Sequence, residues 1–168
     1  GIHKEDGKVK GVQTELGEIQ SSVVVNCGGM WAREIGKMAG VSVPLHACEH
    51  FYVLTSSVPN LGDMPVVRGP DEAAYYKEDA GKIFIGLFEP NAKPWGQNGI
   101  PEDFCFDQLQ DDLEHCMPYL ELAMKRLPVI ENLGIETLFN GPESFTPDDN
   151  FQIGESPELR NFFFAAGF

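Results

Sequence analysis

The chain has 168 residues, of which 42% are hydrophobic, and its 12 basic against 26 acidic side chains give a formal charge of −14. The hydrophobic content is enough to fill the core of a folded domain, which excludes a disordered segment. The strong negative charge would repel a nucleic-acid backbone or an anionic membrane surface, so neither is an expected partner.

The cysteines indicate no metal site and no disulfide framework. Cys27, Cys48, Cys105 and Cys116 have no C-x-x-C spacing and lie in apolar or mixed segments. A free thiol in such a segment behaves as a small hydrophobic side chain. No run in the chain approaches the roughly 20 apolar residues that a membrane-spanning helix needs. The N-terminal residues also show no basic-then-apolar pattern of a signal peptide.

The first 40 residues predict strands, a glycine turn and a helix. Residues 2–19 alternate around two turn signals, which indicates a β-hairpin or meander. Val23 to Val25 predict a buried strand, and residues 31–38 predict a helix after the glycine turn at 26–29. Ligands bind at the carboxyl ends of strands in open α/β sheets, so the turn is a candidate cofactor site. A purely structural turn remains the alternative.

Residues 44–55 predict a strand that is covered on both faces. Alternation puts His50 and Tyr52 on one face and Phe51 and Val53 on the other, and both faces are largely apolar. His50 needs a partner in such a place, because burial of an unpaired polar group is costly. A hydrogen-bonded core histidine is the simpler alternative to a functional one.

Three short strands predict an antiparallel meander at residues 65–68, 73–78 and 83–88. The adjacent Tyr75 and Tyr76 must point to opposite faces, so only one of them can line a given pocket. Tyrosine is also a common strand former, which offers a structural explanation for the pair.

A loop and a helix follow the meander. Residues 89–106 carry repeated Pro and Gly and predict a long loop. Residues 107–126 predict a helix, because apolar side chains recur at spacings of three and four. Pro118 is expected to kink or split it. His115 is interpreted as a packing or surface residue, because no second metal ligand lies at helical spacing.

The last 35 residues predict strands at 134–141, 151–155 and 162–166, with a turn at Thr146 to Asp149 around Pro147. The sequence ends on an apolar strand followed by a glycine. An apolar strand that leads nowhere would leave its surface and edge uncovered, so we expect an internal piece of a longer protein.

Several sequence motifs, taken in order, resemble those of a known family: VVVNCGGMWA, PLHACEHFYVLT, AYYKE, FNGPESFTPD, IGES and FFFAAGF. The set resembles the flavin domain pair of amine oxidoreductases in the glycine oxidase and D-amino-acid oxidase superfamily. Within it, the motifs are most similar to the dimethylglycine and sarcosine dehydrogenase branch. The resemblance covers essentially the whole chain. The motif PLHACEHFY also resembles the regulatory subunit of pyruvate dehydrogenase phosphatase.

The resemblance implies an α+β fold: a mostly antiparallel substrate-domain sheet with helices, interleaved with part of an α/β FAD-binding domain. Residues 1–43 would belong to the FAD-binding domain, residues 44–141 to the substrate-binding domain, and residues 142–168 to the FAD-binding domain again.

The implied activity is oxidation of N-methylated glycines, dimethylglycine or sarcosine, with hydride transfer from the N-methyl carbon to the flavin. His50 and Tyr75 align with a His and a Tyr that line the substrate side of the flavin in related dimethylglycine oxidases. The turn at Cys27 and Gly28 would pass near FAD, with Trp31 against it. Gly167 aligns with the start of a glycine turn at the flavin ring.

Parts of that family's machinery have no counterpart in this sequence. The N-terminal G-x-G-x-x-G motif, the histidine that carries covalent flavin and the tetrahydrofolate-binding domain are missing, so we expect the chain alone to bind FAD poorly and to be inactive. Tetrahydrofolate would enter only through that further domain. The substrate would be a small methylated amine, the electron acceptor is left open, and the expected location is the bacterial cytoplasm or the mitochondrial matrix.

Two alternatives to an enzyme stay open. One is an interaction protein that resembles the phosphatase regulatory subunit on the same fold. The other is a structural α+β module without a ligand of its own. For a substrate carboxylate, Arg68 is a candidate because it ends a strand before Tyr75, and a solvated arginine is the simpler interpretation.

Overall fold

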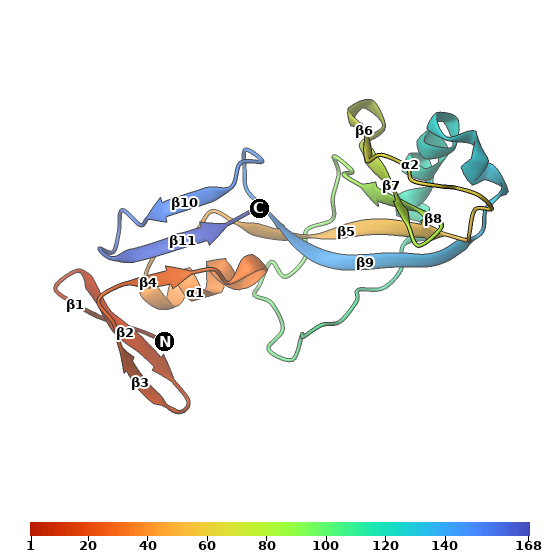
Figure 1. Ribbon diagram of the computed structural model, residues 1–168. Helices are drawn as coiled ribbons and strands as arrows, with labels where there is room; N and C mark the ends of the chain where they lie inside the picture. Colours follow the sequence, from red (N-terminus) through yellow and green to blue (C-terminus); the bar gives the residue numbers. More distant parts are fainter. The chain divides into compact units, whose positions relative to one another are not determined.

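The computed structural model describes residues 1–168, which form two compact units (Figure 1). The first unit contains Gly1–Cys48, Pro94–Asp103 and Glu143–Phe168. The second contains Glu49–Lys93 and Phe104–Pro142. Both combine antiparallel strands with few helices, which confirms the predicted α+β class. No helix in the structure has the length and apolar character needed to cross a membrane.

The first unit begins with the predicted meander, β1 (Ile2–Glu5), β2 (Lys8–Thr14) and β3 (Gly17–Gln20), in that spatial order. Both pairings are antiparallel. Most of its side chains are exposed, and Val9, at 2% exposure, anchors it to the core of the unit.

A second sheet in this unit has the order β10-β11-β4, with β4 (Val24–Asn26), β10 (Gln152–Glu155) and β11 (Phe162–Ala166). Strands β4 and β11 are parallel, so their carboxyl ends meet at one edge. The expected burial of the valine run is wrong: Val23 and Val25 are 45% and 57% exposed. Val24 packs against the core of the unit, and Val23 and Val25, which alternate with it along the chain, point away from that core.

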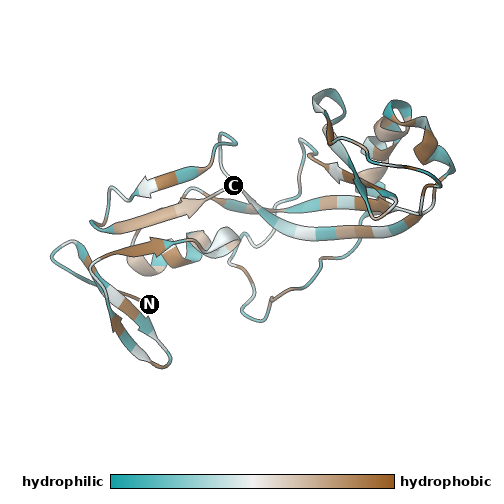
Figure 2. Cartoon of the chain, in the orientation of Figure 1, coloured by the Kyte–Doolittle hydropathy of each residue, from teal (hydrophilic) through white to brown (hydrophobic).

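The predicted helix is present as a 3₁₀ turn, η1 (Gly29–Trp31), followed by α1 (Ala32–Ala39). It ends at Gly40, whose left-handed φ of 71° lets its amide bond back to the last turn. The core beneath the helix contains Val9, Ala32, Ala39, Val41, Val43, Leu45, Leu159, Phe162 and Ala166. The hydrophobic colour along β11 in Figure 2 marks its share of this core.

The second unit is built on a five-stranded sheet of order β6-β7-β8-β5-β9. Its strands are β5 (His46–Thr55), β6 (Val67–Gly69), β7 (Ala74–Asp79), β8 (Lys82–Leu87) and β9 (Ile135–Phe145). The pairings β6–β7, β7–β8 and β5–β8 are antiparallel, which confirms the predicted meander. The short 3₁₀ turn η2 (Pro70–Glu72) connects β6 and β7.

Helix α2 (Leu113–Arg126) covers one face of this sheet and is followed by η3 (Pro128–Asn132). The expected helix start at residue 107 is wrong, because Asp112 caps the helix by accepting a hydrogen bond from the His115 amide at 2.9 Å. The helix continues through Pro118 without splitting. Pro118 has no N–H to donate to the carbonyl of Glu114, four residues earlier in the helix. Glu114 is exposed, so water can hydrogen-bond to that carbonyl instead.

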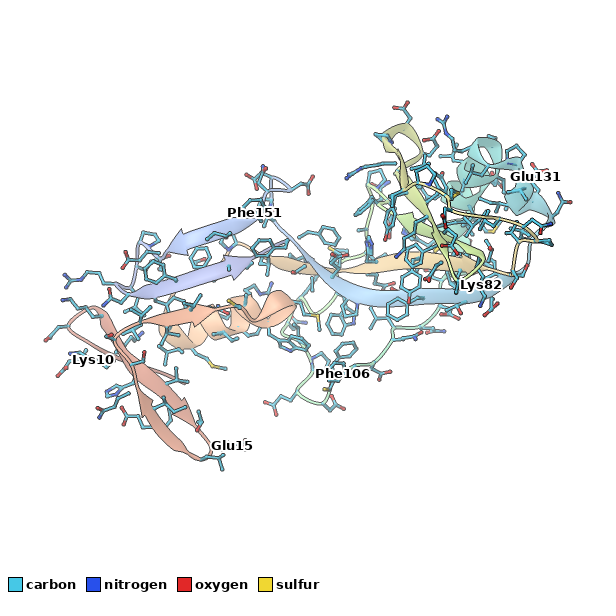
Figure 3. The ribbon with its side chains drawn as sticks, in the orientation of Figure 1. Lys10, Glu15, Lys82, Phe106, Glu131 and Phe151 are labelled. Atoms are coloured by element: carbon cyan, nitrogen blue, oxygen red, sulfur yellow. The ribbon has the colours of Figure 1, made fainter.

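Strand β9 extends through Pro142 to Phe145, beyond the predicted strand end at residue 141. The strand lies at the edge of the sheet order, where a missing N–H does not interrupt a ladder. The predicted turn is confirmed at Thr146, whose carbonyl accepts a hydrogen bond from the Asp149 amide at 3.4 Å. In the loop before α2, the Phe106 side chain is fully exposed (Figure 3).

Candidate functional site

The five-stranded sheet has two unlike faces. Phe51, Tyr76 and Ile85 are 0% exposed and lie under α2. The opposite face carries half-buried or exposed rings from β5, β7, β8, β9 and the residue after β8. We call this surface the aromatic face; its rings belong to His50, Tyr52, Tyr75, Phe84, Phe88 and Phe139. The alternation predicted for Tyr75 and Tyr76 is therefore confirmed.

The rings of the aromatic face form a continuous series. Tyr52 stacks between Phe84 and Phe139, with centroid distances of 4.6 and 4.5 Å. Tyr75 stacks on Phe84 at 5.7 Å. These contacts restrain the ring positions, and the two tyrosines add phenol groups to an otherwise apolar series of half-buried rings.

The two predicted catalytic residues meet at one side chain. The His50 ring lies 5.3 Å from the centroid of Phe88, and the Tyr75 ring lies 5.5 Å from the same centroid. Phe88 is 41% exposed. The imidazole and the phenol thus share one face of the sheet and one neighbouring ring, which is an arrangement that could hold a small polar ligand.

Two cations border the aromatic face. The Arg68 guanidinium carbon lies 5.2 Å from the centroid of Phe88, and the Lys77 ammonium lies 4.6 Å from the centroid of Phe84. Both are cation–π contacts. In the sequence alone, Arg68 is one candidate beside a simpler solvated interpretation, and Phe88 is not singled out. The alternation of Phe84, Gly86 and Phe88 along one strand was the signal that could have found Phe88.

The face under α2 holds a buried polar cluster. Glu89 is 5% exposed and neither carboxylate oxygen has a hydrogen bond; the nearer one lies 3.8 Å from His115 Nε2. Burial, and secondarily the charge of Glu49, raise the pKa of Glu89 to about 7. Glu49 accepts a 2.8 Å hydrogen bond from the buried Asn140. His115 packs on Phe51 with ring centroids 5.5 Å apart, which agrees with its predicted packing role.

The predicted cofactor-binding residues lie in the first unit at the edge where β4 and β11 end. Cys27 and Trp31 are exposed there. Gly29 has a φ of +54° and open space beside it. A Cβ on Gly28 would come within 2.5 Å of Ile35 Cδ1, so this glycine allows the helix to pack closely against the turn.

Gly167 lies beyond the end of β11, at the same edge. Its φ is +74°, and a Cβ there would come within 2.5 Å of Thr146 Cγ2. A bare backbone turn beside an exposed indole, at the carboxyl ends of two parallel strands, fits a nucleotide cofactor with a flat ring.

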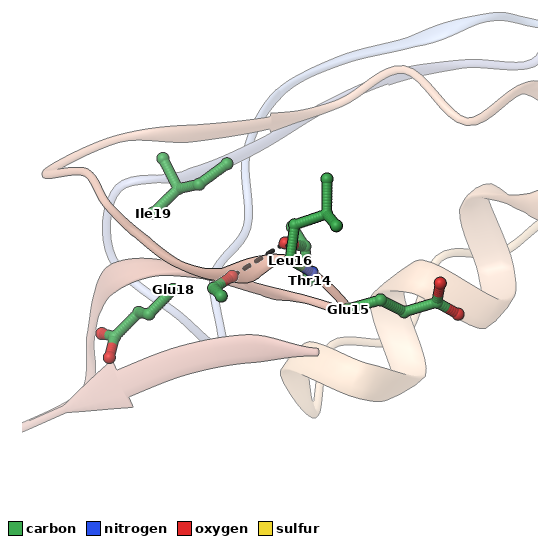
Figure 4. A pocket seen from close by; sticks show the side chains of 6 residues that line it. Thr14, Glu15, Leu16, Glu18 and Ile19 are labelled. Carbon is green, nitrogen blue, oxygen red and sulfur yellow. Dashed lines mark hydrogen bonds between the residues drawn. The ribbon is translucent and has the colours of Figure 1, made fainter.

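Another hollow lies at the turn between β2 and β3 (Figure 4), and six consecutive residues, Thr14 to Ile19, line it. Thr14 Oγ1 donates a 2.8 Å hydrogen bond to the Gly17 carbonyl and closes the turn. Leu16 is fully exposed. The hollow is formed by the hairpin's own side chains and contains none of the predicted site residues.

Comparison with known proteins gives a family match along the whole sequence: the family described as FAD dependent oxidoreductase matches residues 1–168. Human mitochondrial sarcosine dehydrogenase is 42% identical over 161 residues, which cover 96% of this chain and 17% of that protein. Mouse mitochondrial pyruvate dehydrogenase phosphatase regulatory subunit is 39% identical, with coverage of 96% and 19%. Mouse mitochondrial dimethylglycine dehydrogenase is 32% identical, with coverage of 94% and 19%.

Among solved structures, the L-proline dehydrogenase of P. horikoshii superposes with a TM-score of 0.78 at 28% identity, over 100% of this chain and 43% of that one. The chain therefore spans less than a fifth of the length of these curated relatives and under half of this structural neighbour.

Proposed function

Because the chain belongs to the family of FAD-dependent oxidoreductases, we propose that the protein oxidises N-methylated glycines such as sarcosine or dimethylglycine. The observation that carries the proposal is the meeting of His50 and Tyr75 at the Phe88 ring. The similarity to sarcosine and dimethylglycine dehydrogenases supports the substrate class. The second unit would be the substrate domain and the first part of the FAD-binding domain.

Bound FAD would supply the acceptor for the hydride that leaves the N-methyl carbon, and the resulting iminium would then release formaldehyde by hydrolysis. The amine must be neutral when it reacts, because its lone pair forms the new C=N bond. His50 and Tyr75 offer a nitrogen and a hydroxyl that hydrogen-bond or take a proton at that amine. The aromatic face excludes water around the methyl group and orients it.

The first unit would contribute one wall of the FAD site. The open backbone at Gly29 and the turn at Cys27 would let the cofactor approach closely, with the Trp31 ring against it. Gly28 would hold helix α1 against this wall, and Gly167 would complete it from β11. Tetrahydrofolate would require a further domain.

The test uses the whole gene product that carries residues 1–168. We expect a flavin absorbance spectrum that bleaches when sarcosine or dimethylglycine is added without oxygen. Flavin that no methylated amine bleaches would refute the substrate assignment. The variant His50→Ala should lower the rate of flavin reduction far more than the flavin content. Equal losses of both would make His50 a core residue only.

A second candidate is a non-catalytic regulatory subunit, which the 39% identity to the pyruvate dehydrogenase phosphatase subunit favours. It would use the same fold as an interaction surface. A whole gene product that binds no flavin, or binds it without reduction by any amine, would favour this candidate. The proposed location is the mitochondrial matrix or the bacterial cytoplasm, as the mitochondrial relatives suggest for a eukaryotic source.

A further inference from the structure

Arg68 lies in line with the aromatic residues across four strands. The strand register puts Arg68 opposite Tyr75, Tyr75 opposite Gly86, and Gly86 opposite Tyr52. Directly opposed residues of antiparallel strands point to the same face of a sheet. The arginine therefore projects from the same face as the proposed catalytic pair.

The Phe88 ring brings three functional groups together. The guanidinium carbon of Arg68 lies 5.2 Å from its centroid, the His50 ring 5.3 Å and the Tyr75 ring 5.5 Å. A cation–π contact restrains the guanidinium and leaves its five N–H donors available to an anion. A cation, an imidazole and a phenol thus surround one partly exposed ring.

Arg68 differs from the other arginines of the chain in having no polar partner. Arg33 and Arg126 form ion pairs with Glu34 and Glu72, and Arg160 donates a hydrogen bond to the Asp6 carbonyl. Arg68 forms only the contact with Phe88, in a chain with 26 acidic and 12 basic side chains. The Arg68 guanidinium is exposed and has no carboxylate partner, although acidic side chains outnumber basic ones in the chain. It is therefore available to an external anion.

The proposed substrates carry such an anion. Sarcosine and dimethylglycine each hold a carboxylate one carbon away from the methylated nitrogen. A guanidinium matches a carboxylate with two parallel N–H···O bonds, which a lysine ammonium does not reproduce. The arrangement around Phe88 therefore supplies one group for each end of the substrate.

We propose that Arg68 binds the carboxylate of the N-methylated amino acid while His50 and Tyr75 contact its amine, so that Arg68 sets the preference for amino acids over simple amines. This inference rests on the function proposed above. Arg68 is a binding residue and takes no proton in the reaction.

The test compares Arg68→Met with Lys77→Met in the whole flavin-loaded gene product. Lys77 is the matched control, because its ammonium makes the same kind of contact on the same face, 4.6 Å from Phe84. The probe is methoxyacetate, which keeps the carboxylate and replaces the amine by an ether oxygen. Its Kd is read from the change in flavin absorbance, and flavin content is measured for every variant.

We expect Arg68→Met to raise this Kd about 10- to 100-fold, as loss of a charge-assisted hydrogen-bonded partner does, with flavin content unchanged. Arg68→Lys should recover part of the loss, and Lys77→Met should change the Kd less than about threefold. An unchanged Kd in Arg68→Met, equal effects at both positions, or no binding by the wild type would overturn the inference. Absence of flavin reduction by any methylated amine would instead refute the proposed function, which this binding measurement does not require.

Discussion

The ring of Tyr75 lies directly over Gly86 on the neighbouring strand β8. A Cβ built on Gly86 would come within 2.0 Å of Tyr75 Cε1 and 2.7 Å of its hydroxyl oxygen. The two residues are opposed in the strand register. The absent side chain at 86 is therefore what allows the phenol to cross β8, between Phe84 and Phe88.

We expect Gly86→Ala to displace the Tyr75 ring and to lower kcat/KM for the methylated amine about 10- to 100-fold. A misplacement of about 1 Å at a reacting group is enough for a loss of that size. The backbone at 86 needs no left-handed conformation, because no positive φ is found there. The fold should therefore persist, and steady-state kinetics with a thermal unfolding curve would measure both effects.

Gly154→Ala is the control for this substitution, since Gly154 also lies in a strand and a Cβ there meets nothing within 4 Å. It should leave kcat/KM unchanged. If Gly86→Ala were equally harmless, the position of the Tyr75 phenol over Gly86 would have no part in the reaction.

The alternation of side chains carried most of the strand predictions. The pattern around Phe51 and Tyr76 located both faces of the second unit's sheet, because each strand buries every second residue. The errors concern the ends of elements, which depend on hydrogen-bond partners and on neighbouring strands. Asp112, and not the apolar periodicity, sets the start of α2, and the edge position of β9 lets the strand continue through Pro142.

The candidate site was only partly visible in the sequence. The resemblance supplied His50 and Tyr75, and their common contact with Phe88 depends on the register of β5, β7 and β8, which no local pattern determines. The lack of a partner for Arg68 is likewise a property of the folded chain. The buried carboxylate of Glu89 gave no local signal, because its burial results from packing under α2.

Glu89 predicts a decrease in stability as the pH rises. Its pKa is about 7 in the folded protein, against 4.5 for a solvent-exposed glutamate in the unfolded chain. The folded state therefore binds the proton more tightly than the unfolded state does. The stabilisation is complete below pH 4.5 and is lost as the pH rises to about 7, where the buried carboxylate becomes charged. The shift corresponds to about 3 kcal/mol of unfolding free energy. Urea denaturation at a series of pH values, followed by circular dichroism, measures it.

Glu89→Gln should remove this dependence and be more stable than the wild type at pH 8, with the difference vanishing toward pH 4.5. Other ionisable groups near Glu89 are Glu49, His115, Lys93, Asp112 and Cys116, and all of them remain in the variant. Their contributions therefore cancel in the difference between the two proteins, apart from the part that depends on the charge of Glu89 itself. The exposed Glu121→Gln serves as the control. A constant difference across the pH range would contradict the assignment to Glu89.

Gly167 tests whether the edge at β4 and β11 belongs to the cofactor site. Alanine there would be strained at a φ of +74°, and its Cβ would come within 2.5 Å of Thr146 Cγ2 and 3.3 Å of Leu45 Cδ1. The turn must then move away from these residues. We expect Gly167→Ala to weaken FAD binding about 10-fold in the whole gene product. A non-glycine residue in this conformation costs about 1 to 3 kcal/mol, and the turn would shift to relieve that strain.

The measurement is the Kd of FAD from quenching of flavin fluorescence on titration of the apoprotein, with Gly154→Ala as the control. Thr146→Ser in the Gly167→Ala background removes the methyl group that the new Cβ would strike. It should restore part of the affinity if the steric contact is the cause. An FAD affinity that is unchanged in Gly167→Ala would place the cofactor away from the end of β11, and the proposed wall would then reduce to the turn from Cys27 to Trp31.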